Sequence, residues 1–150
     1  MITMEEIKAL REETGLSIMQ CKTALEEAGG DKNKAIVLLK EKGAEIAKKK
    51  GVRSLAAGVV VSYIHAGETI GVMLELLCET DFVAKNPEFK SIARDIAMHI
   101  AAMSPADTTT LLEQPFIKDT EKKISDLINN TVQKFGERTE VGHFVRFSIN

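Results

Sequence analysis

The chain has 150 residues, 44% of them hydrophobic and 28% charged, a size that suits one medium domain or a small module joined to a domain of about 100 residues. Its net charge of −2, with acidic and basic residues interspersed, argues against nucleic-acid binding, and no apolar run approaches the roughly 18–20 residues of a membrane span. The two cysteines lie far apart, so we expect a cytoplasmic protein with neither a disulfide framework nor a metal site.

Three short helices are predicted at the start of the chain. Capping boxes at Thr3–Glu6 and Ser17–Gln20 begin the first two, and glycines end them. Asp31 caps a third helix, which we expect to stop near Gly43. Together they predict a compact helical module.

The character of the chain changes over residues 44–56, where three lysines, Lys48–Lys50, precede a run of small residues. We interpret this stretch as a frayed helix end that leads into a linker. The lysines suit a solvated helix C-terminus, which favours cations, better than a binding patch. The predicted domains are therefore residues 1–52 and residues 53–150.

Beyond this linker the hydrophobic period becomes two. Alternation over residues 59–64 and 70–78, with a turn at residues 65–68, predicts an antiparallel hairpin. Because a lone hairpin is unstable, the apolar face of its second strand must be covered. That face carries Ile70, Val72, Leu74, Leu76 and Cys78.

A long amphipathic helix over residues 87–103 provides this cover, with Asn86 as its N-cap. After it, residues 106–110 are predicted to be structureless and Leu111–Phe116 to be extended. A second helix is expected over residues 124–135. The closing strand is expected to place on one face Val141, His143, Val145, Phe147 and Ile149. Three helices followed by ββ-α-α-β indicate an α+β fold with a small antiparallel sheet packed with helices.

Thr80, Asp81 and Phe82 lie in the corner between the hairpin and the long helix. A phenylalanine beside an ionised aspartate in such a corner is either a packing plug or a probe for another molecule. Asp81 could equally serve as a loop cap. The residues alone leave these alternatives open.

The chain contains no motif that is typical of an enzyme. Phosphate-binding glycine loops, zinc-protease motifs and serine-hydrolase motifs do not occur in the sequence. His99 is interpreted as a residue on the face of the long helix, and His65 and His143 have no nucleophile as a neighbour. Cys21 and Cys78 fall on apolar faces, where a thiol behaves as a small hydrophobe. The residues therefore indicate a binding protein.

Four separated segments resemble parts of the translation elongation factor Ts family, in the same order over nearly the whole chain. They are Leu10–Gly15 with Met19, Cys21, Lys22, Ala24 and Leu25; Glu75–Lys85 apart from Leu77; Leu112–Phe116; and Phe144–Phe147. The resemblance implies a protein that binds elongation factor Tu, in its GDP-bound or nucleotide-free form, and promotes GDP release during translation. It implies no bond chemistry and no cofactor.

The resemblance also implies a first partner contact in the corner described above. Thr80, Asp81, Phe82 and Val83 correspond to a loop that inserts near the Mg²⁺ ion and phosphates of the partner's GTPase domain. Leu77 stands where the family usually has asparagine, so a polar contact under this loop would be lost.

A second contact is implied for residues 1–52, which would form a ubiquitin-associated-like domain. Arg11, Met19 and Lys22 match positions near the partner, and Met19 lies off the apolar stripe of its helix. A partly buried Met19 that fills a gap is the alternative. Ile18 is left out, because the periodicity places it in the core.

The chain resembles a short form of the family with a single core subdomain. Longer relatives have a second subdomain and a helical hairpin, and only residues 104–111 are available for these here. We therefore expect a homodimer, without a disulfide because no cysteine lies in the final strand. Two other hypotheses stay open: an adaptor without exchange activity, and a thiol enzyme with a basic group near Cys21 or Cys78.

Overall fold

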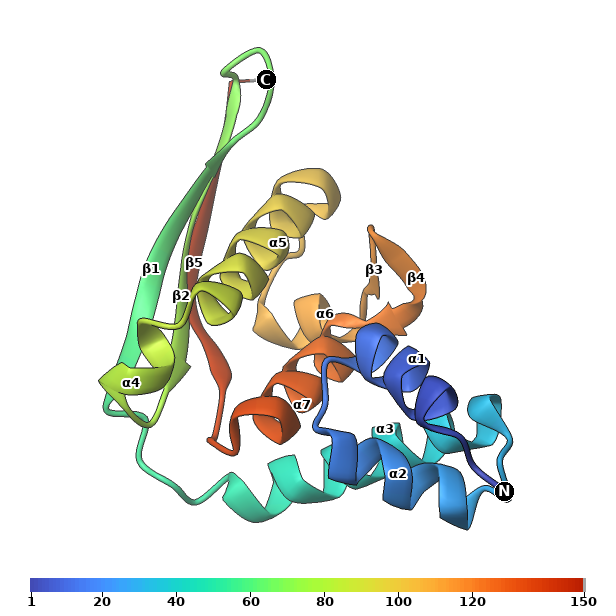
Figure 1. Cartoon of the computed structure of the whole chain (residues 1–150). Helices are drawn as coiled ribbons and strands as arrows, with labels where there is room; N and C mark the ends of the chain where they lie inside the picture. The colour runs from blue at the N-terminus through green and yellow to red at the C-terminus, as the bar shows by residue number, and fades with distance from the viewer. Residues whose placement is uncertain (150) are drawn as a thin grey trace.

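The computed structural model describes residues 1–149 and has the predicted α+β fold, with helices first and a small antiparallel sheet after them (Figure 1). The elements in chain order are α1 (Met4–Thr14), α2 (Ile18–Glu27), α3 (Lys32–Lys50), β1 (Ala57–Ile64), β2 (Ile70–Cys78), α4 (Asp81–Ala84), α5 (Pro87–Met103), α6 (Thr108–Glu113), β3 (Pro115–Phe116), β4 (Asp119–Lys123), α7 (Ile124–Phe135) and β5 (Glu140–Ser148).

Both predicted capping boxes are present in the helical module. The Thr3 hydroxyl accepts the backbone N–H of Glu6, whose carboxylate accepts the backbone N–H of Thr3 at 2.8 Å. Ser17 and Gln20 make the same reciprocal pair. Such caps each contribute about 1 kcal/mol, and the three helices enclose their own small core. That core contains Ile7, Leu10, Leu16, Cys21, Ala24, Leu25, Ala35 and Leu39.

The prediction that the third helix stops near Gly43 is wrong. The helix α3 continues through Gly43 to Lys50, so residues 44–50 extend the third helix and form the helix end that was expected to lead into the linker. Gly43 is buried against α7, and a Cβ atom there would lie 2.7 Å from the Gln133 side-chain oxygen. This glycine therefore permits a close approach of two helices and does not mark a helix end. Through this contact the helical module packs on the rest of the chain.

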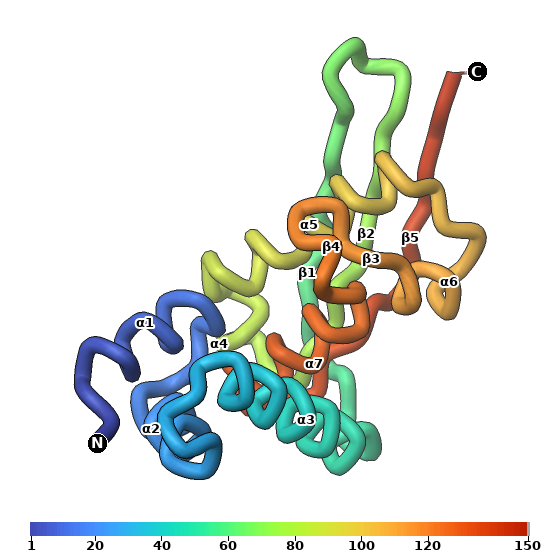
Figure 2. The backbone as a smooth tube through the Cα atoms, turned by 90° about the vertical axis from the view of Figure 1, so that its right-hand side faces the viewer, coloured from blue at the N-terminus to red at the C-terminus, as the bar shows by residue number. Residues whose placement is uncertain are grey.

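The main sheet has the strand order β1-β2-β5, with both neighbouring pairs antiparallel. In Figures 1 and 2, α5 lies along one face of this sheet, and no helix within residues 1–149 covers the opposite face. The predicted apolar face of β2 is the covered face, as expected. Its residues pack against α5 in a core that includes Leu74, Leu76, Phe89, Ile96 and Ile100.

The predicted alternation of the last strand is wrong beyond Gly142. Leu74 of β2 pairs with Phe144, and Leu76 pairs with Val141. The step of two residues in β2 is therefore matched by a step of three residues in β5. This bulge reverses the faces of the residues that follow it. Phe144 therefore turns toward the core, whereas Val145 and Phe147 face solvent. Beyond the bulge Arg146 also faces the helix, where its guanidinium donates to the Ala101 carbonyl oxygen at 3.0 Å.

The segment between the two long helices also differs from its prediction. It was expected to be structureless and then extended, but Thr108–Glu113 form helix α6, whose N-cap is Asp107. A small hairpin of β3 and β4 follows, which the sequence pattern did not predict. His99 holds this segment in place: it is fully buried in α5 and bonded to Gln114 and Ile117, so it belongs to the core rather than the helix surface.

Candidate functional site

The corner after β2 is a single helical turn, α4, which only Glu79 and Thr80 separate from the end of the strand (Figure 1). Its N-cap is Thr80, whose hydroxyl accepts the backbone N–H of Val83 at 3.4 Å. The helical period turns Val83 and Ala84 into the core, each only 4% exposed. The same period turns Asp81 and Phe82 outward. We call residues 80–84 the α4 turn.

Phe82 is 85% exposed, which excludes the interpretation of this side chain as a packing plug. A large apolar side chain this exposed is available for contact with another molecule. Asp81 is also exposed, and no hydrogen bond or ion pair within residues 1–149 involves its carboxylate. The loop cap is Thr80 rather than Asp81. The structure thus leaves one aromatic and one acidic side chain free at the tip of the turn.

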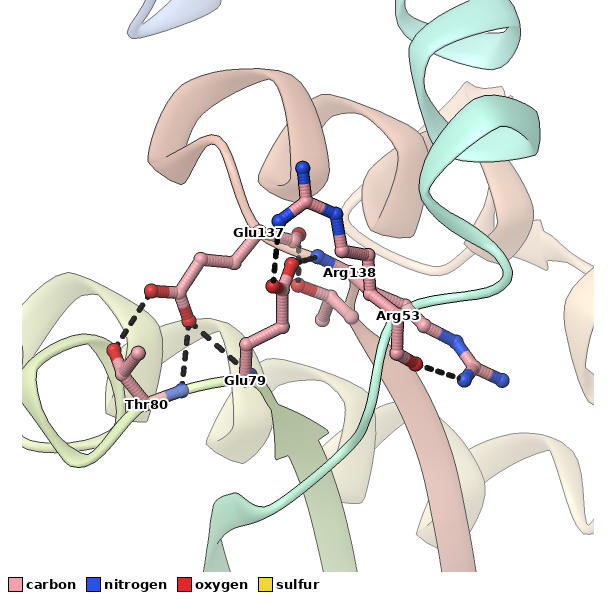
Figure 3. A network of polar contacts seen from close by, with 6 residues as sticks. Arg53, Glu79, Thr80, Glu137 and Arg138 are labelled. Carbon is pink, nitrogen blue, oxygen red and sulfur yellow. Dashed lines mark hydrogen bonds and ion pairs between the residues drawn. The ribbon is translucent and has the colours of Figure 1, made fainter.

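The α4 turn is attached to the segment after α7 by the side chain of Glu137 (Figure 3). One carboxylate oxygen accepts the backbone N–H groups of Glu79 at 3.1 Å and Thr80 at 3.0 Å. The other oxygen accepts the Thr80 hydroxyl at 2.7 Å. Hydrogen bonds to an ionised acceptor are stronger than neutral ones, so this carboxylate fixes the first residue of the turn.

The contact between these two segments runs in both directions. The Glu79 carboxylate accepts the backbone N–H of Arg138 and also lies 3.7 Å from the Arg53 guanidinium. Arg138 in turn donates to the backbone carbonyl of Arg53, in the stretch between α3 and β1, and to the Glu140 carboxylate at 2.9 Å. Figure 3 shows Arg53, Glu79 and Arg138 meeting here from three parts of the chain.

Cys78 lies directly below the α4 turn, where its thiol donates to the Thr80 carbonyl oxygen at 3.3 Å. Burial, with a further contribution from the negative charge of Glu137, raises the pKa of this thiol. A cysteine nucleophile requires the opposite shift, with a lowered pKa and a basic neighbour. The environment of Cys78 therefore argues against the thiol-enzyme hypothesis and indicates a structural thiol.

The residues predicted for the second contact lie on α1 and α2. Arg11 and Lys22 are exposed, and Met19 is 68% exposed, which excludes the interpretation of Met19 as a gap-filling core residue. The prediction that Ile18 lies in the core is wrong, since Ile18 is 39% exposed beside Met19. It is the first residue of α2, where the buried stripe starts only at Cys21.

A groove runs between the helical module and the rest of the chain beside these residues. It is lined by Arg11 and Lys8 on α1 and by Glu88 and Lys134, which form an ion pair with each other. No hydrogen bond or ion pair within residues 1–149 joins the predicted contact residues of α1 and α2 to the α4 turn. The structure therefore keeps the two predicted contacts on separate elements.

The uncovered face of the main sheet carries the largest set of exposed apolar side chains beyond the α4 turn. We call it the outer apolar patch; it consists of Val60, Ile64, Met73, Val145, Phe147 and Ile149. Leu77 lies on the same face, where it packs over Gly58 and Gly142. It does not support the α4 turn, so the expected loss of a polar contact under the turn does not arise from this position.

Sequence reasoning missed Glu137, Arg138 and the part played by Glu79. Glu137 follows the end of a helix at Gly136, where a charged residue carries no local signal. Its partner Thr80 lies 57 residues earlier in the chain. Within residues 1–149 no group of three or more His, Cys, Asp or Glu side chains could hold a metal ion, and none of the helices described is long and apolar enough to cross a membrane.

Comparison with known proteins places this chain in a family. Residues 5–108 match the family model described as Elongation factor TS. The chain is 43% identical to Elongation factor Ts of Thermodesulfovibrio yellowstonii, over 99% of the chain and 96% of the relative. It is 42% identical to Elongation factor Ts of Desulforamulus reducens and 38% identical to that of Thermotoga maritima, covering 89% and 96% of those proteins. The first alignment spans 192 positions against 150 residues here, so that relative carries a segment that this chain lacks.

Proposed function

The chain belongs to the elongation factor Ts family, and from this premise we propose that it acts in translation as a guanine-nucleotide exchange factor. Its partner is elongation factor Tu, in the GDP-bound or nucleotide-free state, and it promotes GDP release without bond chemistry of its own. The observation that carries this proposal is Phe82, an exposed aromatic side chain on a turn that is anchored on both sides.

Phe82 and Asp81 act together at the Mg²⁺ and phosphate site of the partner's GTPase domain. The Mg²⁺ ion bridges the phosphates and neutralises their charge, so displacing its ligands weakens the hold on GDP. Phe82 contributes apolar area as a wedge, and Asp81 contributes a free carboxylate. Val83 was predicted to contact the partner too, but it is buried, so Val83 and Thr80 support the wedge from below.

The energy for this displacement comes from the contact between the two proteins. Each tenfold loss of GDP affinity requires about 1.4 kcal/mol of that contact energy. By thermodynamic linkage GDP weakens the partner's hold on this protein by the same factor. The exchange factor is therefore released once nucleotide rebinds, and it acts repeatedly.

The helical module supplies a second contact with the GTPase domain, through Arg11, Met19 and Lys22. We add Ile18 to this group, because it is exposed next to Met19. Residues 1–52 form a ubiquitin-associated-like domain with its own core, and residues 53–150 form the core and dimerisation domain. The packing of α3 on α7 gives the two contacts a fixed relation.

The protein is a cytoplasmic homodimer that uses the outer apolar patch. Exposed apolar surface of this kind on a sheet face favours burial against a partner. A second copy of the chain presents the same patch in a two-fold arrangement. The second copy would also supply a second core subdomain. This would compensate for the segment that the longer relative has and this chain lacks. Sedimentation over a range of concentrations tests this part of the proposal, and a monomer at every concentration would contradict it.

Release of labelled GDP from elongation factor Tu tests the exchange function. Burying a phenylalanine side chain is worth about 1.5–3 kcal/mol, so Phe82→Ala should slow release by about 10-fold to 100-fold. Val37→Ala is a matched control, because it removes an exposed apolar side chain from α3, a helix that carries none of the predicted contact residues. No acceleration by the unmodified protein would favour the adaptor hypothesis. A fast Phe82→Ala variant would refute the wedge.

A further inference from the structure

We propose that Glu137 is a positioning residue for nucleotide exchange, and this inference rests on the function proposed above. Its carboxylate holds the α4 turn in the orientation that keeps Phe82 directed outward. Glu137 does not itself reach the tip of the turn. It acts through Thr80, the N-cap from which the turn starts.

A single turn of helix needs such outside support. Four residues of helix form too few internal hydrogen bonds to offset the cost of nucleation, and the backbone N–H groups that precede it have no partner within it. Glu137 accepts two consecutive backbone N–H groups, those of Glu79 and Thr80, with one carboxylate oxygen. Its other oxygen accepts a hydrogen bond from the Thr80 hydroxyl, which orients a lone pair of that hydroxyl toward the backbone N–H of Val83.

The backbone that carries Glu137 is itself held in place. The next residue, Arg138, donates its backbone N–H to Glu79, so residues 137–138 and residues 79–80 bind each other in both directions. The Arg138 side chain adds a bond to the Arg53 carbonyl oxygen (Figure 3) and one to the Glu140 carboxylate. A wedge that meets resistance from the partner would therefore push against three segments of the chain and could not fold back alone.

The α4 turn has two supports with different roles. Val83 and Ala84 anchor its C-terminal side in the apolar core. The hydrogen bonds to Glu137 hold its N-terminal end at Glu79 and Thr80, and they are directional. Loss of Glu137 should therefore leave the C-terminal side of the turn attached to the core, while its N-terminal end, which carries Phe82, samples more orientations.

The first test measures the order of the turn without any exchange assay. The chain contains no tryptophan and one tyrosine, so Phe82→Trp introduces at the tip the only tryptophan, which can be excited selectively. We expect its steady-state anisotropy to fall when Glu137→Ala is added, and to change less with Glu137→Gln, whose amide oxygen can still accept the two N–H groups. Glu121→Ala, which removes an exposed carboxylate from β4, is the matched control and should change nothing. Equal anisotropy with and without Glu137→Ala would overturn the inference.

The second test measures labelled-GDP release from elongation factor Tu at saturating and limiting concentrations of this protein. Glu137→Ala should lower the maximal release rate roughly tenfold, while the concentration for half-maximal effect changes little because the helical module still binds. If Glu137 acts through Phe82, the double variant with Phe82→Ala is no slower than Phe82→Ala alone. A further slowing in the double variant would indicate a general structural role and overturn the inference.

Thermal melting of each variant separates loss of order in the turn from loss of the fold. If Glu137→Ala does not fold, Glu137→Gln carries both tests, with the partial loss expected from the missing acceptor for the Thr80 hydroxyl. A Glu137→Gln variant that folds and behaves as the unmodified protein in both tests would overturn the inference. If the unmodified protein does not accelerate GDP release, the proposed function fails, and the anisotropy test still decides whether Glu137 fixes the turn.

Discussion

His99 offers a sharp test of how the core is held together, because it is fully buried and makes two hydrogen bonds. Its Nδ1 atom accepts the backbone N–H of Ile117 at 3.2 Å. With that nitrogen acting as an acceptor, Nε2 carries the proton and donates to the Gln114 side-chain oxygen at 2.9 Å. The neutral ring thus ties α5 to the segment that carries α6 and the small hairpin.

Replacing His99 with leucine removes both bonds at similar volume. The Gln114 side chain is half-buried and can turn to water, so the main cost is the lost partner of the Ile117 N–H, in a residue that is itself half-buried. An unpaired donor costs about 1–3 kcal/mol when it is buried, so for this half-buried donor we expect a loss near the lower end, about 1 kcal/mol. For a chain of this size that lowers the melting temperature by about 2–4 °C. His99→Asn should lose less, because its amide oxygen can accept from Ile117.

The same site predicts a dependence on pH. Burial lowers the pKa of His99, against a smaller opposing effect of the Gln114 hydrogen bond. The unfolded chain then binds a proton more readily than the folded chain. Stability is complete above the unfolded pKa of about 6.5 and declines as the pH falls toward the lowered folded value. His99→Asn does not titrate, so the stability advantage of the unmodified protein over this variant should shrink as the pH falls.

Urea unfolding at several pH values between 5 and 8 measures this difference directly. Comparing two proteins that differ only at position 99 removes the contribution of the carboxylates, which titrate alike in both. A stability difference that stays constant across this range, or that grows at acid pH, would refute the assignment of a buried neutral histidine. A melting temperature unchanged by His99→Leu would refute the role of its hydrogen bonds.

Three further predictions concern the sheet and the helical module. Gly58→Ala should destabilise the sheet by about 1–3 kcal/mol in urea unfolding, because its Cβ would lie 2.6 Å from the Leu76 carbonyl oxygen; an unchanged midpoint would contradict this. Phe147→Asp should shift the sedimentation equilibrium toward monomer without lowering the melting temperature of the monomer, and an unchanged dimer would exclude the outer apolar patch. Ser17→Ala removes the hydroxyl that caps α2 and should cost about 1 kcal/mol in thermal melting, whereas Lys48→Ala on an exposed helix end should cost much less.

The sequence was informative wherever the signal is local. The capping boxes at Thr3 and Ser17, the N-cap Asn86 and the helical stripe of α5 depend on residues within a few positions of one another, and all are present. Alternation also identified the buried face of β2, because a strand with one covered face must follow that period. The exposed position of Met19 followed from the same kind of reasoning.

The predictions were wrong or incomplete where contacts between segments far apart in the sequence determine the structure. Gly43 looks like a helix end in sequence, but its small size serves contact with α7, some 90 residues later. The faces of Val145 and Phe147 depend on a bulge formed opposite β2. Glu137 was missed because its partners are Glu79 and Thr80, and no local pattern connects a glutamate after one helix with a threonine before another.

The separation between Thr80 and Glu137 has a consequence for how the protein is made. Thr80 is synthesised 57 residues before Glu137, which at about 5–20 residues per second is a delay of about 3–11 s. The helical module depends mainly on contacts within its own residues and can fold during this interval. The α4 turn acquires its support only near the end of synthesis, so an incomplete chain would present the helices of the module before it has an ordered Phe82.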